Sequence, residues 1–184
     1  METTKNQLSP YITNFFNRLS RYLDKKLLFF GSVQRSDYFP GKSDIDVDVF
    51  TDNVSSTISK MQHFLKVPKE DFKKFVWRLN VNNKLAHGYK IMYKEPENDF
   101  MAEFSIYDEK YKEGVLEEHN KKSVLPIYAS ILLYILKFLY YQLHFISDKL
   151  YTFTKKKILS LMIGLPDDQF VVLDMKTRKK KENK

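Results

Sequence analysis

Residues 43–50 contain a strict alternation of acidic and apolar side chains at positions 44–49, and this pattern restricts the possible folds more than any other in the chain. The apolar members are Ile45, Val47 and Val49, and the acidic members are Asp44, Asp46 and Asp48. Because successive side chains of a β-strand point to opposite faces, a period of two predicts a strand with one buried face. The other face carries ionised carboxylates, which are costly to desolvate unless water, basic partners or a metal ion balances them.

Asp44 and Asp46 are two positions apart, so on a strand their Cα atoms lie roughly 6.5 Å from each other on one face. At that separation two carboxylates can share divalent cations. The alternative is an exposed edge strand whose acids face water, and the strand alone does not decide between these interpretations. Asp48 points the same way but lies roughly 13 Å from Asp44, which makes it a weaker candidate for the same cluster.

The residues upstream of this strand favour a functional site. Residues 27–30 are an apolar run that predicts a buried strand, and Gly31-Ser32 follows it directly. Gly31-Ser32 would begin a turn or helix whose free backbone N–H groups suit phosphate oxygens, and the Ser32 hydroxyl adds a donor. A lone Gly-Ser pair is a weak signal, but the order strand, Gly-Ser, polar loop and acidic strand is far more specific.

This order resembles the signature of the polymerase-beta-type nucleotidyltransferase superfamily, an apolar strand, Gly-Ser, a loop and then Asp-x-Asp between apolar residues. Here the signature reads Leu28-Phe29-Phe30-Gly31-Ser32-Val33-Gln34-Arg35, then Ser43-Asp44-Ile45-Asp46-Val47. The position of Arg35 and the wording of residues 43–46 are most similar to the small stand-alone members, often called minimal nucleotidyltransferases. The order of elements as far as residue 128 is also similar to that of the family.

The resemblance implies a third carboxylate on a later strand. Glu103 is the candidate, because alternation over residues 100–107 places it on the face opposite to Phe100, Ala102, Phe104 and Ile106. The family usually has Asp at this position. Asp99 and Asp108 are the competing choices, and the alternative for Glu103 itself is a solvated strand residue.

The resemblance also implies an activity and a cofactor. A nucleoside monophosphate would pass from a nucleoside triphosphate such as ATP to an acceptor hydroxyl, with two Mg²⁺ ions, or Mn²⁺ instead, held by Asp44, Asp46 and Glu103. Gly31, Ser32 and Ser43 would bind the nucleotide. Arg35 would contact phosphate through its planar fork, or else form a surface salt bridge.

The rest of the chain predicts an α+β fold, in which a small mixed sheet is flanked by helices and a helical layer follows at the C-terminus. Helices are expected from residue 8 to near Asp24, after a cap at residues 51–53, and over residues 109–120. Residues 89–93 and 100–107 predict a hairpin. We expect a catalytic core over residues 1–122, a helical region over residues 123–174 that packs on it, and a disordered basic tail over residues 175–184.

The apolar stretch 124–146 is long enough to raise the question of a membrane span. It also carries a polar stripe at helical spacing, and Lys137 within that stripe would cost about 2.5–3.5 kcal/mol to insert into a bilayer. We therefore expect one long, largely buried helix from residue 123 to about Asp148, a further helix over residues 151–163, and no stable membrane insertion. The stripe, which contains Lys137, is expected to line the acceptor side of the cleft.

Charge and composition set the remaining expectations. The chain has no cysteine, its four histidines lack ligand spacing, and its start lacks the apolar segment of a signal peptide, which together predict a cytoplasmic protein without a zinc site. About +5 of the net charge of +8 lies in residues 176–184, which favours a nucleic-acid acceptor, with a nuclear location as the alternative. A protein or small-molecule acceptor stays open, as does a catalytically silent module that binds nucleotide, nucleic acid or a protein.

Overall fold

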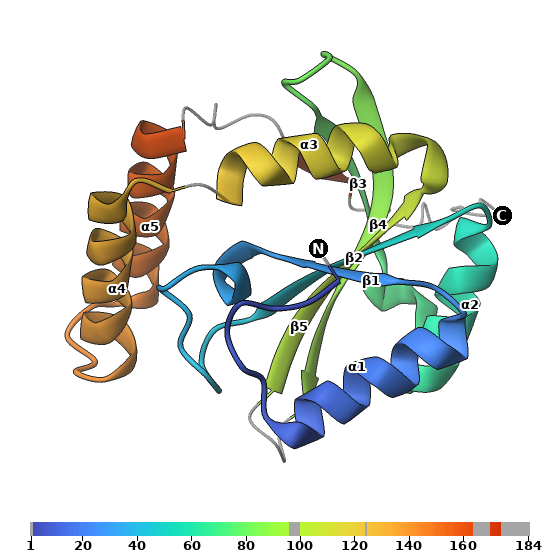
Figure 1. The fold of residues 1–184 in the computed structure, drawn as a ribbon, viewed down its shortest axis with the longest axis horizontal. Coiled ribbons are helices and arrows are strands. Elements are labelled where there is room, and N and C mark those ends of the chain that lie inside the picture. Colours follow the sequence, from blue (N-terminus) through green and yellow to red (C-terminus); the bar gives the residue numbers. More distant parts are fainter. Residues whose placement is uncertain (1, 96–99, 124, 164–169, 174–184) are drawn as a thin grey trace, which may run out of the picture.

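The computed structural model describes residues 2–95, 100–123, 125–163 and 170–173, which form a mixed sheet with helices on both faces (Figure 1). The six strands lie in the order β1-β2-β5-β4-β3-β6. They span Leu27–Phe30 (β1), Ile45–Thr51 (β2), Lys73–Arg78 (β3), Leu85–Glu95 (β4), Phe100–Asp108 (β5) and Phe170–Leu173 (β6). Strands β2 and β5 pair in parallel, and the other neighbouring pairs are antiparallel. This arrangement confirms the predicted α+β class and the predicted hairpin.

Helices α1 (Pro10–Leu23) and α2 (Val54–Leu65) cover one face of the sheet (Figure 1). The Ser9 side chain caps the first turn of α1, and the Asn53 side chain caps that of α2 by accepting a hydrogen bond from the Ser56 amide at 2.9 Å. Such caps satisfy amide groups that a helix start leaves unpaired. Helix α1 ends at Asp24 in a left-handed conformation, which confirms the predicted end.

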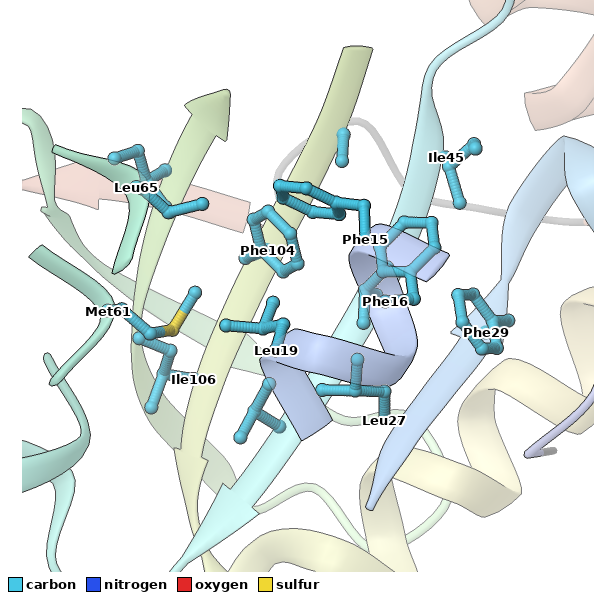
Figure 2. Packing of buried hydrophobic residues seen from close by; sticks show 14 of the residues in the cluster. Phe15, Phe16, Leu19, Leu27, Phe29, Ile45, Met61, Leu65, Phe104 and Ile106 are labelled. Atoms are coloured by element: carbon cyan, nitrogen blue, oxygen red, sulfur yellow. The ribbon is translucent and has the colours of Figure 1, made fainter. Parts of the chain in front are cut away.

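The apolar side of β2 lies at the centre of the main core, which forms between the sheet and the two helices α1 and α2. Ile45, Val47 and Val49 are at most 1% exposed, as the alternation predicted. Figure 2 shows Leu19 and Phe16 of α1 packed among side chains from β1, β2, β5 and α2. Each fully buried aliphatic or aromatic side chain contributes about 1.5–3 kcal/mol, so this cluster fixes which face of β2 turns away from the core.

Helix α3 (Lys112–Ser123) lies across the opposite face of the sheet and follows a short 3-10 turn at Glu109–Tyr111 (Figure 1). Another 3-10 turn, at Lys69–Asp71, precedes β3. A second, smaller core forms beneath it around Phe75, Trp77 and Tyr107. Trp77 is 5% exposed and lies on β3, a strand that is not among the elements expected from the sequence. The acidic side of β2 shares this face with α3.

The C-terminal helices correct two expectations. The single long helix predicted over residues 123–148 is wrong, because α4 (Ile127–Tyr141) ends, His144 adopts a left-handed conformation with φ 53°, and α5 begins anew over Asp148–Ile163. The expectation that this helix is largely buried is also wrong. Its buried residues are Ala129, Leu133, Leu136 and Lys137.

Helices α4 and α5 stand side by side next to the sheet (Figure 1). Within the described residues, no helix has the length and apolarity to cross a bilayer. The range 123–174, predicted to be helical, also contains β6 at the sheet edge beside β3. The basic tail predicted over residues 175–184 lies outside the described residues.

Candidate active site

Gly31 and Asp46 approach each other so closely that no larger residue fits at position 31. The Cα of Asp46 is in register with that of Phe30 across β1 and β2, and Gly31 follows with φ +69°. A Cβ atom at position 31 would overlap the Asp46 Oδ2 atom. Because a left-handed φ also disfavours side chains, glycine is required here for two independent reasons. The Gly-Ser step therefore lies directly against the acidic face of β2.

Ser32 carries a buried hydroxyl without a partner. It lies in the short 3-10 turn Gly31–Gln34, its side chain is 6% exposed, and its Oγ atom has no hydrogen-bond partner within the described structure. A buried hydroxyl left without a hydrogen bond typically costs about 1–3 kcal/mol. Such a group is common where a bound ligand completes the hydrogen bonding.

Asp46 lies between the Gly31 turn and Glu103. Its Cα is in register with that of Glu103 on the parallel strand β5, and Asp44 comes immediately before β2. A small part of Asp46 reaches solvent, but protein atoms surround its carboxylate. Burial raises the pKa of Asp46 well above its usual value, and the negative charges of Asp44 and Glu103 raise it further. The other two predicted carboxylates are thus within electrostatic reach of Asp46.

Glu103 forms an ion pair with a lysine side chain in this structure. Its Oε2 atom lies 3.5 Å from Nζ of Lys90 on the neighbouring strand β4, and both side chains are about a quarter exposed. Among the described residues, no three aspartate, glutamate or histidine side chains converge closely enough to hold a metal ion. Asp44 and Asp46 suit a divalent cation by their chemistry and mutual repulsion, and Glu103 would have to turn away from Lys90 to complete a set of three.

Among the described residues, the other candidate acids Asp108 and Asp48 do not join this group. Asp108 lies at the far end of β5, opposite Thr51, and its carboxylate accepts a hydrogen bond from the Lys110 amide at 3.1 Å. Asp99 lies outside the described residues. Asp48 is 1% exposed and faces α3, where its Oδ2 atom lies 2.9 Å from Nε2 of His119. Burial raises the pKa of Asp48.

Arg35 and Ser43 take part in a buried ionic network behind the carboxylates. Asp37 is fully buried and binds Arg35 through two contacts of 2.8 and 3.2 Å, and its Oδ2 atom lies 2.9 Å from Nζ of Lys137. The same ammonium donates to the Asp37 carbonyl oxygen at 2.7 Å and to Ser43 Oγ at 3.3 Å. The planar fork of Arg35 thus pairs with a carboxylate, in a salt bridge that is mostly buried and so differs from the surface salt bridge given as one of its two alternatives. The Ser43 hydroxyl also accepts from the Phe39 amide.

Lys137, the one charged residue in the polar stripe of α4, therefore points toward the core. Lys137 is 2% exposed and lies against Asp37 rather than in an open acceptor channel. Burial lowers the pKa of Lys137, while the Asp37 carboxylate acts in the opposite direction. This pair fixes α4 to the loop between β1 and β2.

Helix α5 adds two side chains that the sequence analysis did not identify. Tyr151 is 8% exposed, and its hydroxyl has no hydrogen-bond partner within the described structure. Burial raises the pKa of Tyr151, and the Tyr141 hydroxyl and the Asp44 carboxylate raise it further. Lys155 lies one helical turn later, and its positive charge acts to lower the pKa of Asp46. No local sequence pattern connects α5 with β2, and only the fold brings them together.

A cavity of about 950 Å³ lies elsewhere, between residues 2–8 and α1. None of the carboxylates described above lines it. The candidate site is therefore the acidic group around Asp46, which combines a raised pKa with close contact to the Gly31 turn, rather than the cavity.

Comparison with known proteins identifies the family of the chain. A family model for the nucleotidyltransferase domain matches residues 12–182, a range that includes Gly31, Ser32 and all three carboxylates. Comparisons with curated proteins and with solved structures give no match. Because the family match spans nearly the whole chain of 184 residues, this protein belongs to the nucleotidyltransferase family.

Proposed function

We propose that this nucleotidyltransferase transfers a nucleoside monophosphate from a nucleoside triphosphate to an acceptor hydroxyl. One observation carries the proposal: the Asp46 carboxylate lies between Gly31 and Glu103 with a raised pKa. Repulsion among neighbouring carboxylates is the condition that a bound cation relieves. The unpartnered Ser32 hydroxyl beside it supports a phosphate ligand.

Asp44 and Asp46 would hold Mg²⁺, or Mn²⁺ in its place, and Glu103 would complete the set after leaving Lys90. The bound ions would neutralise the charge that develops on the phosphates. Oxygen ligands of this kind are those that both cations prefer. A bound cation would stabilise the ionised form of Asp46 in particular, because the negative charges of two further carboxylates act on it.

Ser32 and the backbone beside Gly31 would bind the terminal phosphates. Lys155 would add a positive charge from the opposite side, since it already acts electrostatically on Asp46. Arg35 and Ser43 would support this site indirectly. Arg35 donates a hydrogen bond to Asp37, and Ser43 accepts one from Lys137. A rigid second layer of this kind keeps catalytic groups in position.

Glu103 would act on the acceptor. It would accept the proton of the acceptor hydroxyl or help to ligate a cation there, and the acceptor oxygen would then attack the α-phosphorus. The new phosphorus–oxygen bond forms as the bond to the β-phosphate oxygen breaks, and pyrophosphate leaves. We favour a nucleic-acid acceptor because the chain carries a net charge of +8, and a protein or small-molecule hydroxyl is the alternative.

The test is transfer of label from each α-labelled nucleoside triphosphate, with Mg²⁺, to total RNA, to DNA and to the protein itself. We expect label in one acceptor, and loss of that label in the double variant Asp44→Asn/Asp46→Asn. Asp52→Asn is the matched control, because Asp52 is an exposed aspartate just beyond the same strand. Equal transfer by the double variant and the control would overturn the assignment of the carboxylates.

A second candidate is a catalytically silent member that binds nucleotide, nucleic acid or a protein without transfer. The ion pair between Glu103 and Lys90 favours it, because a third carboxylate held by lysine is less available to a cation. Nucleotide binding without transfer to any acceptor, lost in the double variant, would support this candidate.

A further inference from the structure

Helix α4 exposes an apolar surface that nothing in the described structure covers. Seven of its large apolar side chains are between 41 and 80% exposed. Tyr134 packs against Phe39, and we call the other six the α4 face: Ile127, Tyr128, Ile131, Leu132, Ile135 and Phe138. At 100° per residue they fall within one sector of roughly 140° around the helix axis. The buried residues Ala129, Leu133, Leu136 and Lys137 fall on the other side. The α4 face is thus one continuous stripe that points away from the core.

The α4 face carries no charge. Lys137 is the one ionisable group of α4 apart from its tyrosines, and it is buried against Asp37. Monomeric proteins rarely expose an apolar patch of more than a few hundred Å² unless it binds something. An acidic or basic partner would find no matching charge on this face, although the chain as a whole is strongly basic.

We infer that the α4 face is the interface of a symmetric dimer, in which it packs against the same face of a second copy. A second copy presents a surface of the same length, apolar character and lack of charge, and two-fold packing brings each residue against its counterpart region. The aliphatic middle of the stripe, Ile131, Leu132 and Ile135, would lie nearest the axis. Homodimer interfaces are typically more apolar than the rest of the surface, as this face is.

The area agrees with a reversible dimer. Aromatic side chains bury on the order of 150–250 Å² when fully covered. At about 180 Å² for each of the six residues, near the low end of that range because four are aliphatic, the exposed fractions leave roughly 600 Å² on each copy. Two copies would together bury roughly 1,200 Å², at the lower end of the range for specific interfaces. We therefore expect an association that depends on protein concentration.

The proposed interface leaves the active site open. Tyr151 and Lys155, which lie near the carboxylates, belong to α5, and Lys137 faces the core from the buried side of α4. The dimer therefore does not depend on nucleotidyl transfer, and its test does not require the activity.

The first experiment is sedimentation velocity of the full chain over a wide range of concentrations. We expect the mass to rise from the 22.0 kDa of the monomer to twice that value. The double variant Ile131→Glu/Ile135→Glu should remain a monomer throughout, with an unchanged circular dichroism spectrum. Leu85→Glu is the matched control, because Leu85 is 52% exposed but lies on β4, and it should dimerise like the wild type.

A second experiment stays informative if the charged variant fails to fold. The chain has no cysteine, so Ile131→Cys introduces a single thiol near the proposed axis, and mild oxidation should link two copies through a disulfide. Leu85→Cys should link far more slowly. A monomer at every concentration, or equal linking of the two cysteine variants, would overturn the dimer, as would a wild-type monomer that binds phosphatidylcholine vesicles through Ile131 and Ile135.

Discussion

Asp46 and Glu103 lie directly opposite each other on the parallel strands β2 and β5, while Lys90 on β4 lies 3.5 Å from the Glu103 carboxylate. Glu103 therefore has two competing neighbours. It can stay with the lysine or, under the proposed function, turn to a cation that Asp44 and Asp46 would hold. Which of these states predominates decides whether the site is an active transferase or a binding module.

Removing the positive charge of Lys90 beside Glu103 should strengthen metal binding. In Lys90→Met, Glu103 loses its ionic partner and is more readily available to a divalent ion. We expect half-maximal label transfer at a severalfold lower Mg²⁺ concentration than in the wild type, whereas Glu103→Gln should lower transfer by about ten- to a hundredfold. A Mg²⁺ requirement that stays the same in Lys90→Met would show that Lys90 and the metal ion do not compete for Glu103.

Lys155 should act on nucleotide binding more than on turnover. Its charge reaches Asp46 from α5, where triphosphate oxygens would lie. We expect Lys155→Met to raise KM for the nucleotide by about tenfold, or about 1.4 kcal/mol, with a smaller change in kcat. Lys157→Met is the control, because Lys157 is exposed on the same helix. Equal effects of the two substitutions would remove Lys155 from the site.

The buried Asp37 network should be a major contribution to stability. Asp37→Asn leaves Arg35 and Lys137 without their carboxylate, and loss of one member of a buried ion pair typically costs about 3–5 kcal/mol. Urea unfolding measures this cost. The exposed pair between Lys26 and Glu2, at 2.6 Å, is the control, and Lys26→Ala should leave the unfolding midpoint unchanged. A small effect of Asp37→Asn would show that α4 is held in another way.

The same network predicts how stability depends on pH. Burial acts to raise the pKa of Asp37, but Arg35 and Lys137 outweigh it and hold the pKa below the usual value of 3.8. The unfolded chain therefore takes up the proton first as the pH falls. The stabilisation is fully present above pH 3.8 and is lost as the pH falls through the lower, folded-state value. Unfolding free energies across the acidic range should show this loss in the wild type and not in Asp37→Asn.

The sequence predicted the parts of the fold and of the candidate site that depend on local patterns. The alternation over residues 43–50 identified the buried side of β2, and the same reasoning put Glu103 on the face that it occupies. The Gly31 turn was also predicted from local residues. In each case the period of a strand or the conformation of one residue decides the outcome.

The parts that were missed depend on contacts between distant residues. Lys137 and Asp37 are 100 positions apart, and nothing near either residue indicates that they meet. The break before α5 depends on a left-handed residue, His144, inside an otherwise helical pattern. The same break turns α5 back along α4, which brings Tyr151 and Lys155 to the site.

Nucleotidyl transfer at Asp46 is tested most directly by counting both products of a single reaction. Purified protein, α-labelled nucleoside triphosphate, Mg²⁺ and the acceptor are mixed, and pyrophosphate release and labelled acceptor are followed together. We expect equal amounts of the two products in the wild type and in Asp52→Asn, and a reduction of both by at least about a hundredfold in Asp46→Asn. Pyrophosphate release that continues unchanged in Asp46→Asn, or its absence from the wild type with every nucleotide and acceptor, would show that Asp46 does not carry out nucleotidyl transfer.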